Sequence, residues 1–474
     1  MREKNIIIKT IELLTTIIIY YLVGKQSIFY YALSLSLYNV FISFFKSITI
    51  KDNLENISNN KSKIKLLKLS MLTISVISFF FLLLGLILSD IASNALKLED
   101  LFIIFLLMGL TITIEPTLNI LTDYLETTKY KNPSLILNTY YIIDSFLLII
   151  ITTLSFRIFH LKNTLAISLL YLSKIISFLI ILIIIYEIIK LQSKKNLQDK
   201  KTLKVNYHEE IKKVLTNCYP TSIINIVKNS YYYISIILLY LILTTRYGYA
   251  IPQIDNDITF IYFYGLTIIN YLIFILEYIT KKYYKVGNVF DKMYLSIRIT
   301  LPLSIIFSII SPLICNVIFY DSSKSIYLLI LNFLAIFISL YDITFKSIQN
   351  KKIILISLIT GLIFKLILTI PLINSFYRMG YSLMYGDILS TIIAMLLSII
   401  INHIYLTNKY QKEKNYLEKI LTILYENIIL CIILILVEFI IPIKQASYLK
   451  SLLLIGVYLL ICYIIFKLKN QKRG

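Results

Sequence analysis

The feature that most constrains the fold is a series of apolar runs, each about twenty residues long, that recurs along the whole chain. A helix of that length spans the hydrocarbon core of a bilayer. Hydrophobic residues make up 58% of the 474 residues and charged residues only 15%, so a soluble fold has no interior large enough for this apolar surface. The sequence therefore predicts an all-α, polytopic membrane protein.

Turn signals and charged residues separate fourteen such runs, which we interpret as fourteen transmembrane helices. The predicted spans are 5–23, 27–49, 66–89, 100–121, 133–155, 164–189, 214–243, 258–280, 294–319, 325–345, 353–375, 383–406, 418–441 and 448–466.

The distribution of Lys and Arg indicates the orientation of these spans, because cytoplasmic loops carry an excess of both. If the N-terminus lies inside, most of the 47 Lys and Arg residues fall on cytoplasmic loops and tails. An odd number of spans would reverse this bias, so we expect both termini to be cytoplasmic. Topology thus explains the net charge of +21, and no nucleic acid is expected as a partner.

The remaining composition gives no sign of a metal or another cofactor. The four Cys and three His residues are scattered singly and form none of the spacings that are typical of zinc sites or redox motifs. We therefore expect no metal site and no cofactor.

The longest charged loop lies between the sixth and seventh spans and divides the chain into halves. Tyr31 and Tyr38 in the second span align with Tyr264 and Tyr271 in the eighth at one fixed offset, which favours an internal repeat. The predicted parts are an N-terminal six-helix bundle at 1–190, a cytoplasmic linker at 191–213, a C-terminal six-helix bundle at 214–410, and two additional helices at 411–474.

Three local motifs accompany this organisation. A charged corner joins the fourth and fifth spans, from Asp123-Tyr124-Leu125 through two lysines to Pro133. The seventh span opens with a basic approach and an early proline at Tyr219-Pro220-Thr221, and the first hairpin turns at Leu22-Val23-Gly24. In their order and spacing these motifs resemble the multidrug, oligosaccharidyl-lipid and polysaccharide (MOP) exporter superfamily over nearly the whole chain.

Within that superfamily, fourteen spans and a high lysine content resemble the polysaccharide flippase branch (Wzx-, SpoVB- and MurJ-like proteins). The resemblance implies a MATE-like fold with two pseudo-symmetric six-helix bundles and two extra helices, in a bacterial cytoplasmic membrane. It implies a transporter, not an enzyme, which flips a polyprenyl-diphosphate-linked glycan by alternating access for surface polysaccharide such as O-antigen. Membrane lipids, a polysaccharide polymerase and glycosyltransferases are the partners that it implies.

Other functions stay open. MurJ-like proteins are known for cavity arginines on the first, second and eighth helices, whereas this sequence has only Lys46 near the inner end of the second and Glu277 in the eighth. A lipid II flippase is therefore an alternative, followed by a MATE-like exporter of drugs or small cations. A non-transporting membrane scaffold and a membrane-embedded glycosyltransferase are alternatives from other classes.

Charges deep inside spans are the candidate site residues, because such charges usually face an interior cavity. We expect Lys228 and Lys365, with Lys46, to attract the diphosphate, since no equally deep acidic residue is apparent near the first two in the second half. The alternative is that each lysine extends to a membrane surface or has a partner that the sequence does not reveal.

Acidic residues and tyrosines complete the candidate site. Asp144 and Lys174 lie at similar depth on consecutive antiparallel helices, where they can neutralise each other. Glu12, Glu115 and Asp144 are candidates for coupling to H⁺ or Na⁺, with capping or pairing within a hairpin as the alternative. The four repeat-related tyrosines Tyr31, Tyr38, Tyr264 and Tyr271 are candidates for a cavity wall that binds sugar hydroxyls.

Overall fold

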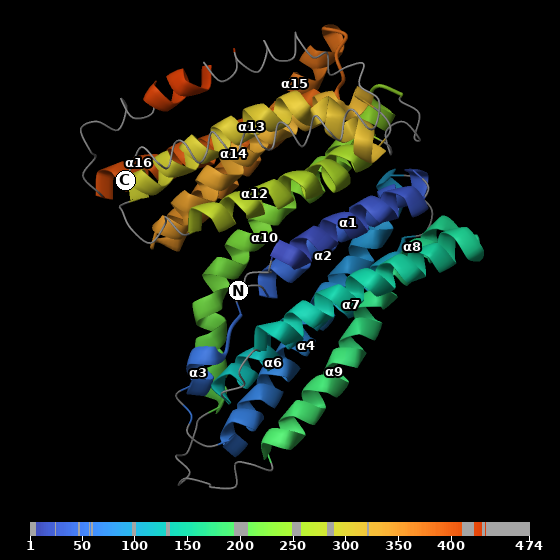
Figure 1. The fold of residues 1–474 in the computed structure, drawn as a ribbon, viewed down its shortest axis with the longest axis vertical. Coiled ribbons are helices and arrows are strands. Elements are labelled where there is room, and N and C mark those ends of the chain that lie inside the picture. The colour runs from blue at the N-terminus through green and yellow to red at the C-terminus, as the bar shows by residue number, and fades with distance from the viewer. Residues whose placement is uncertain are drawn as a thin grey trace. The chain divides into compact units, whose positions relative to one another are not determined.

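The structure is a computed structural model in which every regular element among the described residues is helical (Figure 1). The described residues are 6–23, 25–45, 48–55, 57, 60–96, 101–128, 133–193, 207–248, 257–281, 289–319, 322–409, 421–428 and 432. The elements are α1 (Ile6–Leu22), α2 (Lys25–Phe45), α3 (Lys51–Glu55), α4 (Asn60–Leu96), α5 (Phe102–Thr111), α6 (Ile114–Thr127), α7 (Pro133–Thr153), the π-helix η1 (Leu154–Ile158), α8 (Asn163–Leu170), α9 (Leu172–Ser193), α10 (Tyr207–Thr245), the π-helix η2 (Phe260–Gly265), α12 (Leu266–Lys281), α13 (Val289–Phe319), the 3₁₀-helix η3 (Ser322–Lys324), α14 (Ser325–Ser347), α15 (Lys351–Arg378) and α16 (Met384–Lys409).

These helices coincide with the first twelve predicted spans, and ten described helices are long and apolar enough to cross a membrane. The helices at the first and eighth spans are shorter: α1 has 17 residues, and α12 has 16 and directly follows η2. The last two predicted spans lie outside the described residues, apart from 421–428 and 432. The all-α fold class is confirmed, and the protein is a multi-pass membrane protein.

Two predicted spans are interrupted in the middle, which the apolar pattern does not reveal. The fourth is broken between α5 and α6, because Pro116 has no N–H to donate to the carbonyl of Ile112 four residues earlier. The break places Glu115 in the first turn of α6. The sixth is broken at Tyr171, between α8 and α9, where no proline accounts for the interruption.

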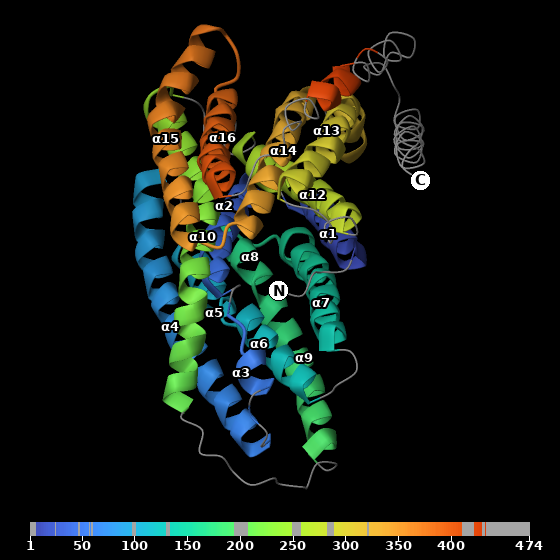
Figure 2. The same ribbon diagram turned by 90° about the vertical axis from the view of Figure 1, so that its left-hand side faces the viewer.

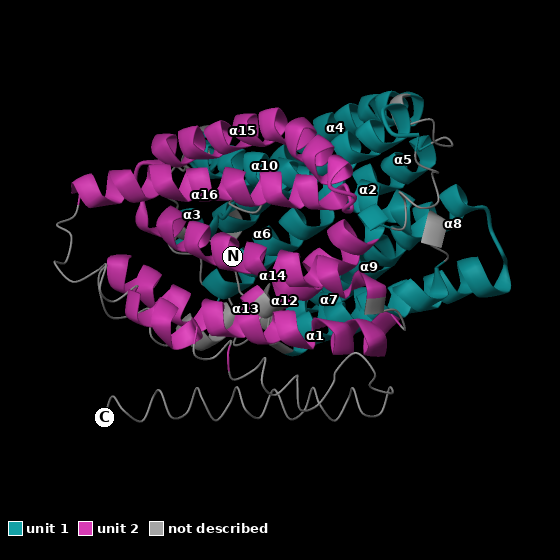
Figure 3. Ribbon diagram, turned by 90° about the horizontal axis from the view of Figure 1, so that it is seen from above, with its two compact units in different colours: residues 1–259 teal, residues 260–474 magenta. Residues whose placement is uncertain are grey.

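The chain divides into two compact units, Met1–Thr259 and Phe260–Gly474 (Figure 3). The seventh span, α10, belongs to the first unit because it packs against α2 and α4 (Figure 2). The ring of Tyr240 stacks on Phe29 with centroids 5.2 Å apart, and Ser222 Oγ donates to the carbonyl of Phe44 at 2.6 Å. The linker and bundle boundaries derived from the sequence stay a prediction, since much of 191–213 is outside the described residues.

The second unit is organised around the antiparallel pair α15 and α16, which run side by side (Figure 3). At their closest approach Gly386 faces the backbone of Ile373: a Cβ atom at position 386 would lie 2.5 Å from the Ile373 nitrogen and 2.7 Å from its Cα. Only glycine allows the two helix backbones to approach this closely. The glycine therefore fixes the distance between α15 and α16.

Replacing Gly386 with Ala should lower the free energy of unfolding by about 1–3 kcal/mol, because the added methyl group meets backbone that cannot rotate away. Thermal unfolding in detergent measures this loss. Gly85→Ala is the matched control, since its Cβ would lie at ordinary contact distances of 3.5 Å from Phe41 and 3.7 Å from Met108. Equal melting temperatures for the two variants would contradict the close-approach argument.

Candidate functional site

The first unit contains an ion pair in its interior. Asp144 on α7 and Lys174 on α9 approach to 3.3 Å, and Ser173 Oγ donates a 2.6 Å hydrogen bond to Asp144 Oδ1. The Asp144 and Lys174 side chains are 11% and 16% exposed, so the pair is mostly buried but still accessible. The predicted pairing of these two charges is confirmed.

The break in the sixth span positions this pair. Tyr171 at the break ends α8, and α9 begins directly afterwards, so Ser173 and Lys174 lie in the first turn of the new helix. The Tyr171 hydroxyl donates to Ser34 Oγ on α2 at 2.8 Å and anchors the break to the neighbouring helix.

Tyrosine rings surround the pair on the side of α2. Tyr31 and Tyr38 lie 6.0 and 6.4 Å from the ring of Tyr171, measured between centroids. The Lys174 ammonium lies 5.5 Å from the centre of the Tyr38 ring, within the range of a cation–π contact. The structure thus brings predicted Tyr31 and Tyr38 together with predicted Asp144, in one charged site lined by aromatic rings.

The three predicted coupling carboxylates, Glu12, Glu115 and Asp144, all lie in this unit and each interacts electrostatically with Tyr141 on α7. Glu12 also forms a local ion pair with Lys9, one turn earlier on α1, at 2.9 Å. Asp144 forms its ion pair with Lys174 on α9. Glu115 is half-buried and interacts electrostatically with both Tyr38 and Lys174.

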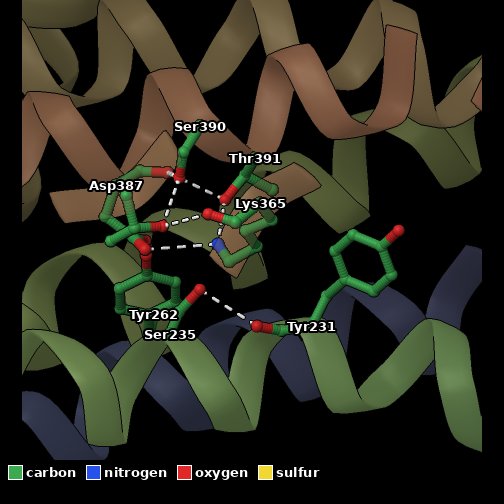
Figure 4. A network of polar contacts seen from close by, with 8 residues as sticks. Tyr231, Ser235, Tyr262, Lys365, Asp387, Ser390 and Thr391 are labelled. Carbon is green, nitrogen blue, oxygen red and sulfur yellow. Dashed lines mark hydrogen bonds and ion pairs between the residues drawn. The ribbon is translucent and has the colours of Figure 1, made fainter. Parts of the chain in front are cut away.

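A second buried pair lies in the second unit (Figure 4). Lys365 Nζ on α15 lies 3.2 Å from Asp387 Oδ1 on α16, and both side chains are completely enclosed. Lys365 also donates to Thr391 Oγ1, and the Tyr262 hydroxyl on η2 donates to Asp387 Oδ2. Thr369 and Ser390 extend the network through hydroxyls 3.0 Å apart.

The expectation that Lys365 has no deep acidic partner is wrong. Asp387 lies in the first turn of α16, a position that the sequence places near the membrane surface. In the structure this turn packs against the last third of α15, where Gly386 meets Ile373, and the Lys365 side chain from the middle of α15 reaches Asp387. The signal that was missed is the i, i+4 spacing of Asp387 and Thr391, which puts both on one helix face.

The other predicted residues fall into separate places. Lys228 is half-buried on α10 in the first unit. Tyr264 is buried on η2 in the second unit, 5.8 Å from Phe319 between ring centroids, and Tyr271 is half-buried on α12. Lys46 lies outside the described residues, so its predicted role, like that of the other site residues, stays a prediction.

These features define a class of protein: a multi-pass helical membrane protein with two compact units and charged groups held inside each of them. No protein-family model matches the sequence, and no curated protein matches it. Solved structures do match it.

The lipid II flippase MurJ in an inward closed conformation matches with a TM-score of 0.61 and 16% identity, over 97% of this chain and 97% of that chain. An inward-facing multidrug resistance MATE family transporter of the MOP superfamily matches with a TM-score of 0.57 and 10% identity, over 86% and 97%. A eukaryotic MATE transporter matches with a TM-score of 0.53 and 12% identity, over 89% and 96%. The chain therefore has the MOP exporter fold, as its sequence motifs predict.

Proposed function

We propose that this protein is a flippase that moves a lipid-linked oligosaccharide, a polyprenyl-diphosphate glycan, across a bacterial cytoplasmic membrane by alternating access. The observation that carries the proposal is the Asp144–Lys174 pair, an accessible charged site inside a unit whose outer surface is apolar. The similarity in fold to the lipid II flippase MurJ, which extends over 97% of both chains, supports it.

A flippase has to give a hydrated headgroup a polar path while the lipid tail stays in hydrocarbon. The outward side chains of α4 suit the tail, since Leu72, Phe79, Phe80 and Ile87 are all more than half exposed. The interior of the same unit offers charges, hydroxyls and tyrosine rings instead. This contrast is what an amphipathic substrate requires.

The Asp144–Lys174 pair also suggests how transport is coupled to an ion. H⁺ or Na⁺ at Asp144 competes with the Lys174 ammonium, so its binding releases the ammonium to a diphosphate oxygen. Loss of the ion restores the pair and releases the headgroup. Among the three predicted carboxylates we assign the coupling role to Asp144, because it pairs with a lysine on another helix.

Lys228 is the deep lysine that we assign to the diphosphate, because Lys365 is enclosed with Asp387. Lys228→Gln should lower the flipping rate in proteoliposomes about tenfold to a hundredfold, since a hydrogen bond to a charged group contributes about 1.5–3 kcal/mol. The rate is measured as exposure of a fluorescent lipid-linked sugar to an external quencher. Lys212→Gln is the control, because Lys212 is exposed on the same helix. An undiminished rate for the Lys228 variant would remove this residue from the mechanism.

Deletion of the gene tests the function as a whole. We expect lipid-linked glycan to accumulate in the cytoplasmic leaflet and surface polysaccharide to fall, with both restored by the wild-type gene. Neighbouring genes for glycosyltransferases and a polysaccharide polymerase would support the proposal. If no lipid-linked glycan accumulates, the proposal fails. Accumulation of lipid II would favour a lipid II flippase instead, and sensitivity to cationic drugs alone would favour a MATE-like exporter.

A further inference from the structure

Three polar groups in the first unit lack hydrogen-bonding partners among the described residues. The hydroxyls of Tyr38 on α2 and Tyr140 on α7 belong to side chains that are 3% and 0% exposed, and neither makes a hydrogen bond to a described residue. The Glu115 carboxylate on α6 forms no hydrogen bond or ion pair with the described part of the chain. Three separate helices therefore contribute one unsatisfied group each.

These groups lie near one another. The Tyr38 hydroxyl interacts electrostatically with Glu115, Tyr140 and Asp144, and the Tyr140 hydroxyl with Glu115 and Asp144. They also lie near the Asp144–Lys174 pair, whose ammonium is 5.5 Å from the centre of the Tyr38 ring. A buried polar group without a partner costs about 1–3 kcal/mol, and a native protein has few of them, so two buried hydroxyls beside a half-buried carboxylate point to a missing ligand.

The chemistry of the three groups selects the ligand. A carboxylate only accepts hydrogen bonds, whereas a phenol hydroxyl both donates and accepts. A group that satisfies all three has to donate to Glu115 and accept from Tyr38 and Tyr140, as hydroxyls do. None of the three groups carries a positive charge that would bind a phosphate oxygen, which leaves the diphosphate to Lys174 and Lys228, and the nearby Lys174 ammonium disfavours a cation at Glu115. The site therefore suits a neutral ligand that carries several hydroxyl groups.

We propose that Glu115, Tyr38 and Tyr140 form a saccharide subsite that binds hydroxyl groups of a sugar in the lipid-linked glycan. This proposal rests on the proposed flippase function and assigns it a headgroup contact separate from the diphosphate. The Tyr31 and Tyr171 rings next to Tyr38 offer apolar faces for the C–H groups of the sugar. Glu115, which the sequence predicts as a coupling group, becomes a positioning residue for substrate.

Binding in nanodiscs tests the subsite with soluble probes. The probes are farnesyl diphosphate and a panel of farnesyl diphosphates that carry one glucose, galactose, N-acetylglucosamine or N-acetylgalactosamine. We expect wild-type protein to bind at least one sugar-bearing probe more tightly than the bare diphosphate. Tyr38→Phe, Tyr140→Phe and Glu115→Gln should each reduce this preference about threefold to tenfold. The two Phe variants should leave affinity for the bare diphosphate unchanged, and Glu115→Gln, which removes a negative charge near Lys174, should not lower it. Tyr186→Phe, at an exposed position on α9, should keep the full preference.

The outcomes separate the subsite from the function. If wild-type protein binds the bare diphosphate but prefers no sugar, or if the three variants keep the full preference while melting at the wild-type temperature, the groups bind water only and the subsite is overturned. The flippase proposal survives both results. If wild-type protein binds no probe at all, the proposed function fails together with the subsite.

Discussion

Lys365→Met is expected to lower the free energy of unfolding by about 3–5 kcal/mol, the largest stability effect that the structure predicts. The substitution leaves Asp387 enclosed without the cation that neutralises its charge. A completely buried carboxylate without its cation carries a desolvation penalty that no solvent relieves. The loss of stability therefore comes more from the uncompensated charge of the buried Asp387 carboxylate than from the missing contact with Lys365.

A double-mutant cycle measured by thermal or denaturant unfolding in detergent separates these two effects. Lys365→Met combined with Asp387→Leu should recover most of the stability, since an apolar pair of similar volume replaces a buried ion pair at little cost. A residual loss of about 1 kcal/mol is expected from the Tyr262 hydroxyl, which loses its acceptor. Lys352→Met, at an exposed position on the same helix, should change nothing. If the single and the double variant lost the same free energy of unfolding, the uncompensated charge of Asp387 could not be the main cause.

The sequence predicted the features of this fold that depend on local pattern. Twelve spans follow from apolar length alone, because the bilayer fixes how long such a run has to be. The Asp144–Lys174 pair follows from two charges at equal depth on consecutive antiparallel helices, which a short connection keeps adjacent. Tyr38 was chosen as a candidate from the proposed repeat, and in the structure its ring lies 5.5 Å from the Lys174 ammonium.

Features that depend on packing between distant segments could not be predicted from the sequence. Asp387 looked superficial because the apolar pattern shows neither the close packing of α16 on α15 at Gly386 nor the reach of the Lys365 side chain to Asp387. The placement of α10 in the first unit depends on contacts with α2, which is far away in the chain. The break at Tyr171 positions Lys174, but no proline in the sequence indicates that the helix is interrupted there.

The largest functional effects are expected at the Asp144–Lys174 pair. Asp144→Asn and Lys174→Gln should each lower flipping in proteoliposomes at least tenfold, because each removes one charge of the exchange between coupling ion and headgroup. Their binding properties should differ. Asp144→Asn mimics the neutralised carboxylate and leaves the Lys174 ammonium available, so it should bind bare farnesyl diphosphate at least as tightly as wild-type protein does. Lys174→Gln should lose both binding and transport.

The double variant Asp144→Asn/Lys174→Gln decides whether the pair acts by its charge or only by holding α7 against α9. Two neutral amides still hydrogen-bond at this distance, so a purely structural pair would regain transport in the double variant. We expect it to stay inactive, because the coupling ion then has no carboxylate to bind and the diphosphate has lost the Lys174 ammonium. Lys190→Gln, at an exposed position on α9, is the control. Recovery of flipping in the double variant would remove the charge exchange from the mechanism and leave the pair as a support for the helices.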